Sequence, residues 1–313
     1  VDKDGMAAMG MRTFVYLQPG ERMSCVGCHE PRRMTPAPGA APRKNAFPPL
    51  QAPPGPHGER GLSFAGTVQP VLDRHCIRCH GLERTAAGLS LLGTIPDKPL
   101  RLGQVKASEA YHGLTRRKGL VVAALRNRET PFSRPGDYGA RAGRLAPKFL
   151  HGDEHHPPLP KDDFRRLARW LDLNAPFYGD YSWNKREWRQ PDPHGERALR
   201  TAVRERFGDS WAEQPFAALV NVASPEQSRI LLAPLPIGSG GWGQVETAAW
   251  TGKEDPAFQQ METLVRAAIQ PLPHKDLEGT CQQTPCQCRS CWVRDAEKAY
   301  RTRLRKHARQ TPE

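Results

Sequence analysis

Two short stretches of the sequence each hold two cysteines, two spacer residues and a histidine. The residues are, in chain order, Cys25, Cys28 and His29, then Cys76, Cys79 and His80. This Cys-x-x-Cys-His spacing is typical of c-type haem attachment, in which both thiols form thioethers to one porphyrin and the histidine binds iron axially. We therefore expect two covalently attached haems, each with its motif histidine as an iron ligand.

Three other readings of the cysteine pairs compete with haem. A thioredoxin-like redox pair needs a βαβ setting, which neither flank suggests. A zinc site could draw on both pairs of cysteines, and disulfides could form in an oxidising compartment. None of these explains a histidine directly after both pairs, so the spacing favours haem.

The second motif follows a predicted helix. In "FAGTVQPVLDRHCIRCHG", Thr67 can cap the helix and Pro70 lies in its first turn, where the missing N–H costs little. Helical spacing relates four apolar positions, which are Val68, Val71, Leu72 and Cys76. A helix leading into the attachment site is how a small cytochrome c module begins.

The first motif has a different setting. The stretch "RTFVYLQ" has the composition of a strand and "PGE" that of a turn, so we expect this haem at a strand–turn edge. Its distal ligand stays open, and the site could also be five-coordinate. The candidates are Met6, Met9, Met11, Met23, Met34 and His57.

For the second haem, His155 and His156 are the candidate distal ligands. They lie in a proline-stiffened loop before a predicted helix, which Asp162 or Asp163 could cap. The apolar face of that helix is Phe164, Leu167, Ala168 and Leu171. His155 and His156 could instead be solvated surface histidines, and His112 and His151 are weaker candidates for the ligand. Because no methionine lies between Met34 and Met261, bis-histidine iron is favoured, with a lower potential than a histidine–methionine haem.

The last four cysteines crowd into "CQQTPCQCRSCW". They are Cys281, Cys286, Cys288 and Cys291. They could bind zinc as thiolates, form two disulfides or hold an iron–sulfur cluster. Trp292 follows the last pair in place of histidine, so this is not a third haem site of the same type. The basic amphipathic helix expected at 295–310 could dock to an acidic partner.

Composition predicts a mainly α fold with short β segments and much irregular chain. Only 38% of the residues are hydrophobic, while 31 are proline and 28 glycine, so the apolar cores must be small. We expect a first haem segment at 1–50, ending a larger upstream domain. A proline- and glycine-rich linker at 51–61, a cytochrome c-like domain at 62–182 and a C-terminal extension at 183–313 follow. Within these, 93–150 reads as loop-rich with a short helix ending near Leu150, and 183–280 carries little signal.

The net charge of +13 suggests an acidic redox partner protein, because charge complementarity speeds encounter. The basic residues are scattered and no nucleic-acid-binding signature is present. No apolar run is long enough to span a membrane. Because haem c is attached outside the cytoplasm, we expect an exported, periplasmic-type location. The opening residues read like the middle of a domain, which suggests a piece of a larger protein or complex.

Several stretches together resemble the hydrazine synthase alpha subunit family, in its middle and C-terminal haem regions. They are "MRTFVYLQPGERMSCVGCHEPR", "TVQPVLDRHCIRCHG", "GARAGRL", "RRLARWLDLNAPFYG" and "RILLAPLPIGSGGWG". The resemblance implies a β-propeller before the first motif and a bis-histidine C-terminal haem. In the hydrazine-forming members, a tyrosine four residues after the first motif histidine ligates iron and that histidine turns to zinc. The matching position here is Arg33, which weakens the case for hydrazine chemistry.

Two functions follow from these observations. One is an exported dihaem c-type cytochrome, or a fragment of one, that transfers electrons. The other is the haem-bearing part of a redox enzyme acting on small nitrogen compounds, with the first haem catalytic. A sensing module with a ligand-binding haem is a third function class.

Overall fold

The computed structural model describes residues 2–8, 62–82, 85–96, 106–123, 135–153, 157–179, 186–245 and 249–271. Within them the chain is mainly helical with long irregular connections, which confirms the predicted class. Isolated bridges, His80 with Thr85 and Pro191 with Ile269, are the β pairing in these ranges. The strand and turn expected at 12–21 lie outside the described residues.

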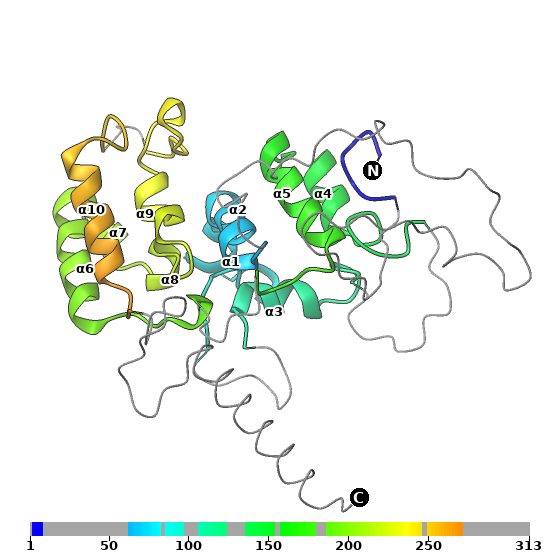
Figure 1. Cartoon of the computed structure of the whole chain (residues 1–313), viewed down its shortest axis with the longest axis horizontal. Helices are drawn as coiled ribbons and strands as arrows, with labels where there is room; N and C mark the ends of the chain where they lie inside the picture. The colour runs from blue at the N-terminus through cyan, green and yellow to red at the C-terminus, as the bar shows by residue number, and fades with distance from the viewer. Residues whose placement is uncertain are drawn as a thin grey trace, which may run out of the picture.

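Five helices surround a first hydrophobic core (Figure 1). They are α1 Phe64–Thr67, α2 Gln69–His75, α3 Glu109–Arg116, α4 Leu145–His151 and α5 Lys161–Asp172. The short helix expected to end near Leu150 is α4, and the expected apolar face of α5 is buried. Helix α3 was not predicted from the sequence, where its region reads as loop.

The helical entry to the second motif consists of two short helices, α1 and α2. Ser63 caps α1, and its hydroxyl accepts a hydrogen bond from Gly66 N at 3.0 Å. The predicted cap, Thr67, is the last residue of α1, and the N-cap of α2 is Val68, without a side-chain cap. Pro70 is the second residue of α2, where no helical hydrogen bond is lost. The four apolar positions at helical spacing, Val68, Val71, Leu72 and Cys76, are all buried.

Aromatic side chains fill the first core. Phe64 of α1 packs edge-on against Tyr111 of α3 at 5.4 Å and Trp170 of α5 at 5.2 Å, measured between ring centroids. Phe177 joins them, 5.1 Å from Tyr111. Edge-to-face pairs of this kind stabilise beyond their buried area. The cluster therefore ties the helix before the second motif to α5.

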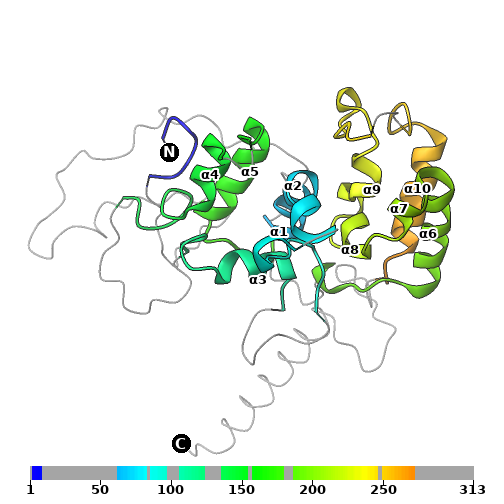
Figure 2. The same ribbon diagram turned by 180° about the vertical axis from the view of Figure 1, so that it is seen from behind.

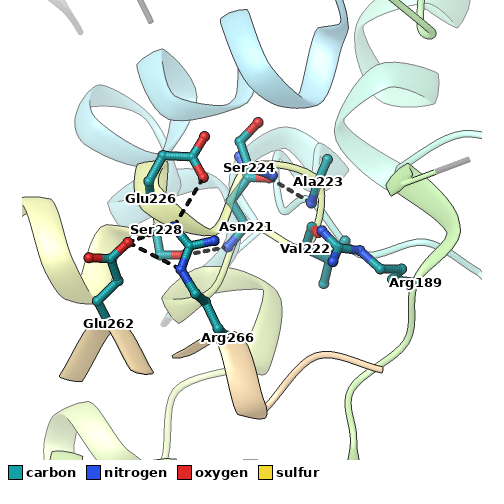
Figure 3. A network of polar contacts seen from close by, with 9 residues as sticks. All are labelled: Arg189, Asn221, Val222, Ala223, Ser224, Glu226, Ser228, Glu262 and Arg266. Carbon is teal, nitrogen blue, oxygen red and sulfur yellow. Dashed lines mark hydrogen bonds and ion pairs between the residues drawn. The ribbon is translucent and has the colours of Figure 1, made fainter. Parts of the chain in front are cut away.

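A second core lies further along the chain. Its helices are α6 Pro193–Phe207, α7 Asp209–Ala212, α8 Phe216–Leu219, α9 Arg229–Leu232 and α10 Pro256–Ala267, with short helical turns η3 Arg186–Trp188, η4 Pro225–Gln227 and η5 Ile237–Ser239. Gly195 lets α6 approach the end of α10, because a Cβ there would lie 2.1 Å from Ala267 O. Arg266 of α10 pairs with Glu262 at 2.6 Å and with Glu226 at 4.0 Å (Figure 3).

The two cores touch through α1 and α2. In both views these helices lie between α4–α5 on one side and α8–α9 on the other (Figures 1 and 2). Asn221 Nδ2 donates to Ala65 O at 2.6 Å, and Gln244 Nε2 donates to Arg74 O at 2.7 Å. Among the described helices, none is both long and apolar enough to cross a bilayer.

Candidate cofactor site at the second motif

The second motif closes a tight turn at the end of α2. Cys76 N donates to Leu72 O, and the backbone nitrogens of Cys79 and His80 both donate to Cys76 O, at 3.2 and 3.0 Å. The Cys76 side chain is buried, whereas Cys79 and His80 are partly exposed. The motif thus presents its second cysteine and its histidine at the edge of the first core.

The imidazole of His80 is oriented by the chain that follows it. Its Nδ1 lies 3.1 Å from Leu89 O, and Leu91 N donates to His80 O at 2.7 Å. A carbonyl oxygen only accepts, so Nδ1 is the donor here, and in the neutral imidazole this leaves the lone pair on Nε2. Metal-binding histidines commonly donate their other ring N–H to a backbone carbonyl in this way. This donor set fits an axial haem ligand.

Two glycines let the segment 89–92 lie close to the motif. A Cβ at Gly81 would lie 2.7 Å from Leu92 Cγ, and one at Gly113 of α3 would lie 2.6 Å from Leu89 Cδ1. Neither distance is tolerated between carbon atoms. The absent side chains therefore leave room for the Leu92 side chain against Gly81 and for the Leu89 side chain against α3.

No disulfide joins Cys76 and Cys79. Burial raises the pKa of the Cys76 thiol to about 12, and the nearby Asp73 and Cys79 act in the same direction. Cys76 is therefore a protonated thiol at neutral pH, unlike the low-pKa thiolate of a thioredoxin-type site. Across the described ranges, no group of three or more histidine, cysteine, aspartate or glutamate side chains could hold a metal ion.

One turn before Cys76, α2 carries a buried carboxylate that sequence reasoning missed. Asp73 accepts a hydrogen bond from Gln69 Nε2 at 2.8 Å. Burial raises its pKa to about 7, against the opposing effects of that hydrogen bond and of Arg229 on α9. The Arg229 guanidinium lies 4.5 Å from the centroid of the Trp211 ring. An acidic residue on the apolar face of a helix is the sequence signal that could have revealed this site.

Asp163 has a different role from the predicted one. Helix α5 has Pro160 at its N-cap and no side-chain cap, because neither Asp162 nor Asp163 is placed to cap it. Asp163 instead accepts hydrogen bonds from His75 Nε2 at 2.8 Å and from Arg74 at 3.2 Å. It thereby joins the start of α5 to the residues just before Cys76.

The remaining candidate residues are divided between described and undescribed parts. His151 is exposed at the end of α4, and His112 is buried in α3 beside the Tyr111 ring. Met6 is buried in the first core, near Ala7, whose N–H donates to Asp172 Oδ2 at 2.8 Å. The other sequence-predicted site residues lie outside the described residues: Met9, Met11, Met23, Cys25, Cys28, His29, Met34, His57, His155, His156, Cys281, Cys286, Cys288 and Cys291.

One family model matches the chain, that of the hydrazine synthase alpha subunit middle domain, over residues 1–30. This stretch includes the first Cys-x-x-Cys-His motif and stops one residue after it. No curated protein and no solved structure matches the chain. The N-terminal end is therefore similar to part of a redox enzyme subunit.

Proposed function

We propose that the chain is a dihaem c-type cytochrome, or part of a larger one, that transfers electrons. The observation that carries the proposal is the geometry at His80. Its Nδ1 is engaged by Leu89 O while Nε2 remains available, directly after a pair of cysteines with no disulfide between them. A haem bound here would supply reversible one-electron exchange at iron.

Each residue of the second motif would have its own role in binding haem. The thiols of Cys76 and Cys79 would form the two thioethers, and His80 Nε2 would ligate iron. The hydrogen bond to Leu89 O would hold the imidazole in one orientation and make it a stronger electron donor to the metal. The buried Cys76 would fix one edge of the porphyrin to the first core.

His155 or His156 would supply the distal ligand. Support comes from the contact of Asp163 with His75, the residue that precedes Cys76. Asp163 follows His156 by seven residues, so the helix that begins after these histidines starts beside the motif. Replacing these histidines tests the assignment directly.

The first haem would be held by Cys25, Cys28 and His29. We place the protein in an exported, extracytoplasmic setting, where c-type haem is attached. Its +13 net charge would favour an acidic redox partner through long-range attraction. The four tail cysteines would form either a zinc site or disulfides. The alpha-subunit match at residues 1–30 supports membership of a larger complex.

A second function is the haem-bearing part of a redox enzyme with the first haem catalytic. The match to the hydrazine synthase alpha subunit middle domain favours it, because the matched stretch contains the first motif. Arg33 argues against the same iron ligation as in the hydrazine-forming enzymes. An open coordination position on the iron of the first haem, rather than sequence similarity, would therefore decide between the enzyme and the electron carrier.

Haem attachment is tested by producing the chain with a c-type maturation system and measuring its denatured mass and its pyridine haemochrome spectrum. We expect two covalent haems in the parent chain and one in each of C25A/C28A and C76A/C79A. The matched control C281S/C286S should retain two. A parent chain with the bare polypeptide mass and no bound pigment would refute the proposal.

Carbon monoxide distinguishes the two functions once haem is attached. Addition to the reduced protein should leave both Soret bands unchanged if the chain only transfers electrons. Binding at the haem of Cys25 and Cys28, assigned by repeating the titration on C76A/C79A, would instead support the enzyme.

A further inference from the structure

A small cavity lies where the two hydrophobic cores meet. Its volume is about 20 Å³, and its walls come from α1, α2, the start of α3, η3 and the loop after α8. Four buried polar side chains reach its lining: Gln69, Ser108, Glu187 and Asn221. A space with four polar side chains in its lining is unlike the wholly apolar cavities that remain dry in protein cores.

Hydrogen bonds fix the orientation of the Gln69 amide in this wall. Its Nε2 donates to Leu91 O at 2.9 Å and to Asp73 Oδ1 at 2.8 Å. Rotating the amide by 180° would bring Oε1 against these two acceptors, so only one orientation is compatible with its neighbours. Oε1 therefore points away from Asp73 and Leu91.

Gln69 Oε1 is buried, and no donor among the described residues reaches it. The side chain is only 3% exposed, so bulk water does not satisfy this oxygen. A buried acceptor without a donor costs free energy comparable to a lost hydrogen bond. Native structures rarely tolerate this.

Gly93 provides space beside that oxygen. A Cβ built on Gly93 would lie 3.3 Å from Gln69 Cδ and 3.6 Å from Oε1. Gly93 also lines the cavity. The absent side chain therefore leaves room next to the one polar atom of Gln69 that needs a donor.

We propose that this cavity binds a single water molecule, which donates a hydrogen bond to Gln69 Oε1. The volume exceeds the roughly 10–15 Å³ that one water requires, and a buried water needs two to four polar partners. Water also suits the mixed lining, because it can donate to an amide or carboxylate oxygen and accept from a hydroxyl. The proposal does not depend on haem.

The water would lie between the two cores, beside the direct hydrogen bond from Asn221 to Ala65 O. Asn221, on the far wall, is already held by its bond to Ala65 O. Its Oδ1 also accepts hydrogen bonds from Ala223 N and Ser224 N (Figure 3). On the near wall, the water would stabilise the amide orientation in which Gln69 donates to Asp73. It would thus support the carboxylate one turn before Cys76.

A crystal structure of the full chain at high resolution tests the site. We expect a fully occupied solvent peak within hydrogen-bond distance of Gln69 Oε1. In solution, water–amide cross-relaxation should detect a long-lived water at the side-chain NH₂ of Gln69. An empty cavity in the crystal, or a protein donor bonded to Oε1, would overturn the proposal. It would also be overturned if soaking with rubidium placed an anomalous scatterer at the peak, because the site would then hold a cation and not water.

Gly93→Ala provides a second test. Its methyl should exclude the water and raise the unfolding equilibrium constant roughly tenfold, the effect of one unsatisfied buried acceptor. Gly238→Ala is the matched control, because a Cβ there meets no atom within 4 Å. If Gly93→Ala retains the solvent peak or unfolds like the control, the water is not bound as proposed. If the variant does not fold, the parent crystal and the cross-relaxation measurement still decide.

Discussion

His75 and Asp163, 88 positions apart in the chain, form a hydrogen bond of 2.8 Å between α2 and the first turn of α5. Both side chains are largely buried, with 18% and 11% of their surface exposed. The pair connects the residue before Cys76 with the segment that follows His155 and His156. This contact therefore fixes the start of α5 beside the second motif.

Asp163→Asn should lower the free energy of unfolding by about 1–3 kcal/mol at pH 7, the usual contribution of a hydrogen bond to a charged group. Burial raises the pKa of Asp163, but the hydrogen bond and charge of His75, with Arg74 and Arg166, outweigh burial and leave the pKa lower than its ordinary 3.8. This stabilisation is present above pH 3.8 and is lost as the pH falls through the folded-state pKa. Urea unfolding from pH 2.5 to 7 measures it. Asp162→Asn, whose side chain is 83% exposed, should change stability little.

Asp73→Asn should change the pH dependence of the free energy of unfolding in the direction opposite to that of Asp163→Asn. Burial holds the Asp73 pKa at about 7, higher than its ordinary 3.8, so ionisation costs more in the folded state than in the unfolded state. The stability that protonated Asp73 contributes is fully present below pH 3.8 and is lost as the pH rises through 7. The loss is about 4 kcal/mol at most. Urea unfolding of wild type and variant between pH 4.5 and 8 should show a stability difference that grows in favour of the variant. A constant difference, as expected for the exposed control Glu213→Gln, would contradict this.

Gly113→Ala should destabilise the chain by about 1–2 kcal/mol, although alanine is the better helix former. The new methyl would meet Leu89 Cδ1 at 2.6 Å and Ser90 O at 3.2 Å, so the Leu89 side chain must shift and the Ser90 carbonyl must yield by a few tenths of an ångström. Thermal unfolding measures the loss, and the ¹⁵N shift of His80 Nδ1 should report a weaker bond to Leu89 O. Gly252→Ala, whose Cβ would meet only Ser239 Oγ at 3.8 Å, should alter neither.

Local pattern predicted the elements nearest the second motif. Helical spacing identified the buried faces of α2 and α5, because a single apolar stripe on each faces the first core. Capping was predicted less well. Val68 and Pro160 occupy the N-caps of α2 and α5, in place of the predicted Thr67 and of Asp162 or Asp163. Competing cap residues within one turn are not distinguished by sequence alone.

The second core and the polar junction could not be predicted for a different reason. Helices α7, α8 and α9 have four residues each, too short to show a period, and they are stable only through long-range packing. The contacts of Asp73 with Arg229 and of Asn221 with Ala65 join residues more than 150 positions apart. Such pairs depend on how two cores dock, which local spacing does not encode.

Replacing His155 and His156 singly by alanine tests the distal ligand in the haem-loaded chain. If one of them ligates the iron bound by His80, its loss should leave that iron five-coordinate or water-ligated, and the ferric signal should change from low to high spin. Electron paramagnetic resonance at low temperature measures the change. His151→Ala is the matched control, because this histidine is exposed at the end of α4 and should leave the spectrum unchanged. Low-spin signals in both variants would exclude the pair as ligands, and a high-spin signal in His112→Ala would then identify the buried histidine of α3.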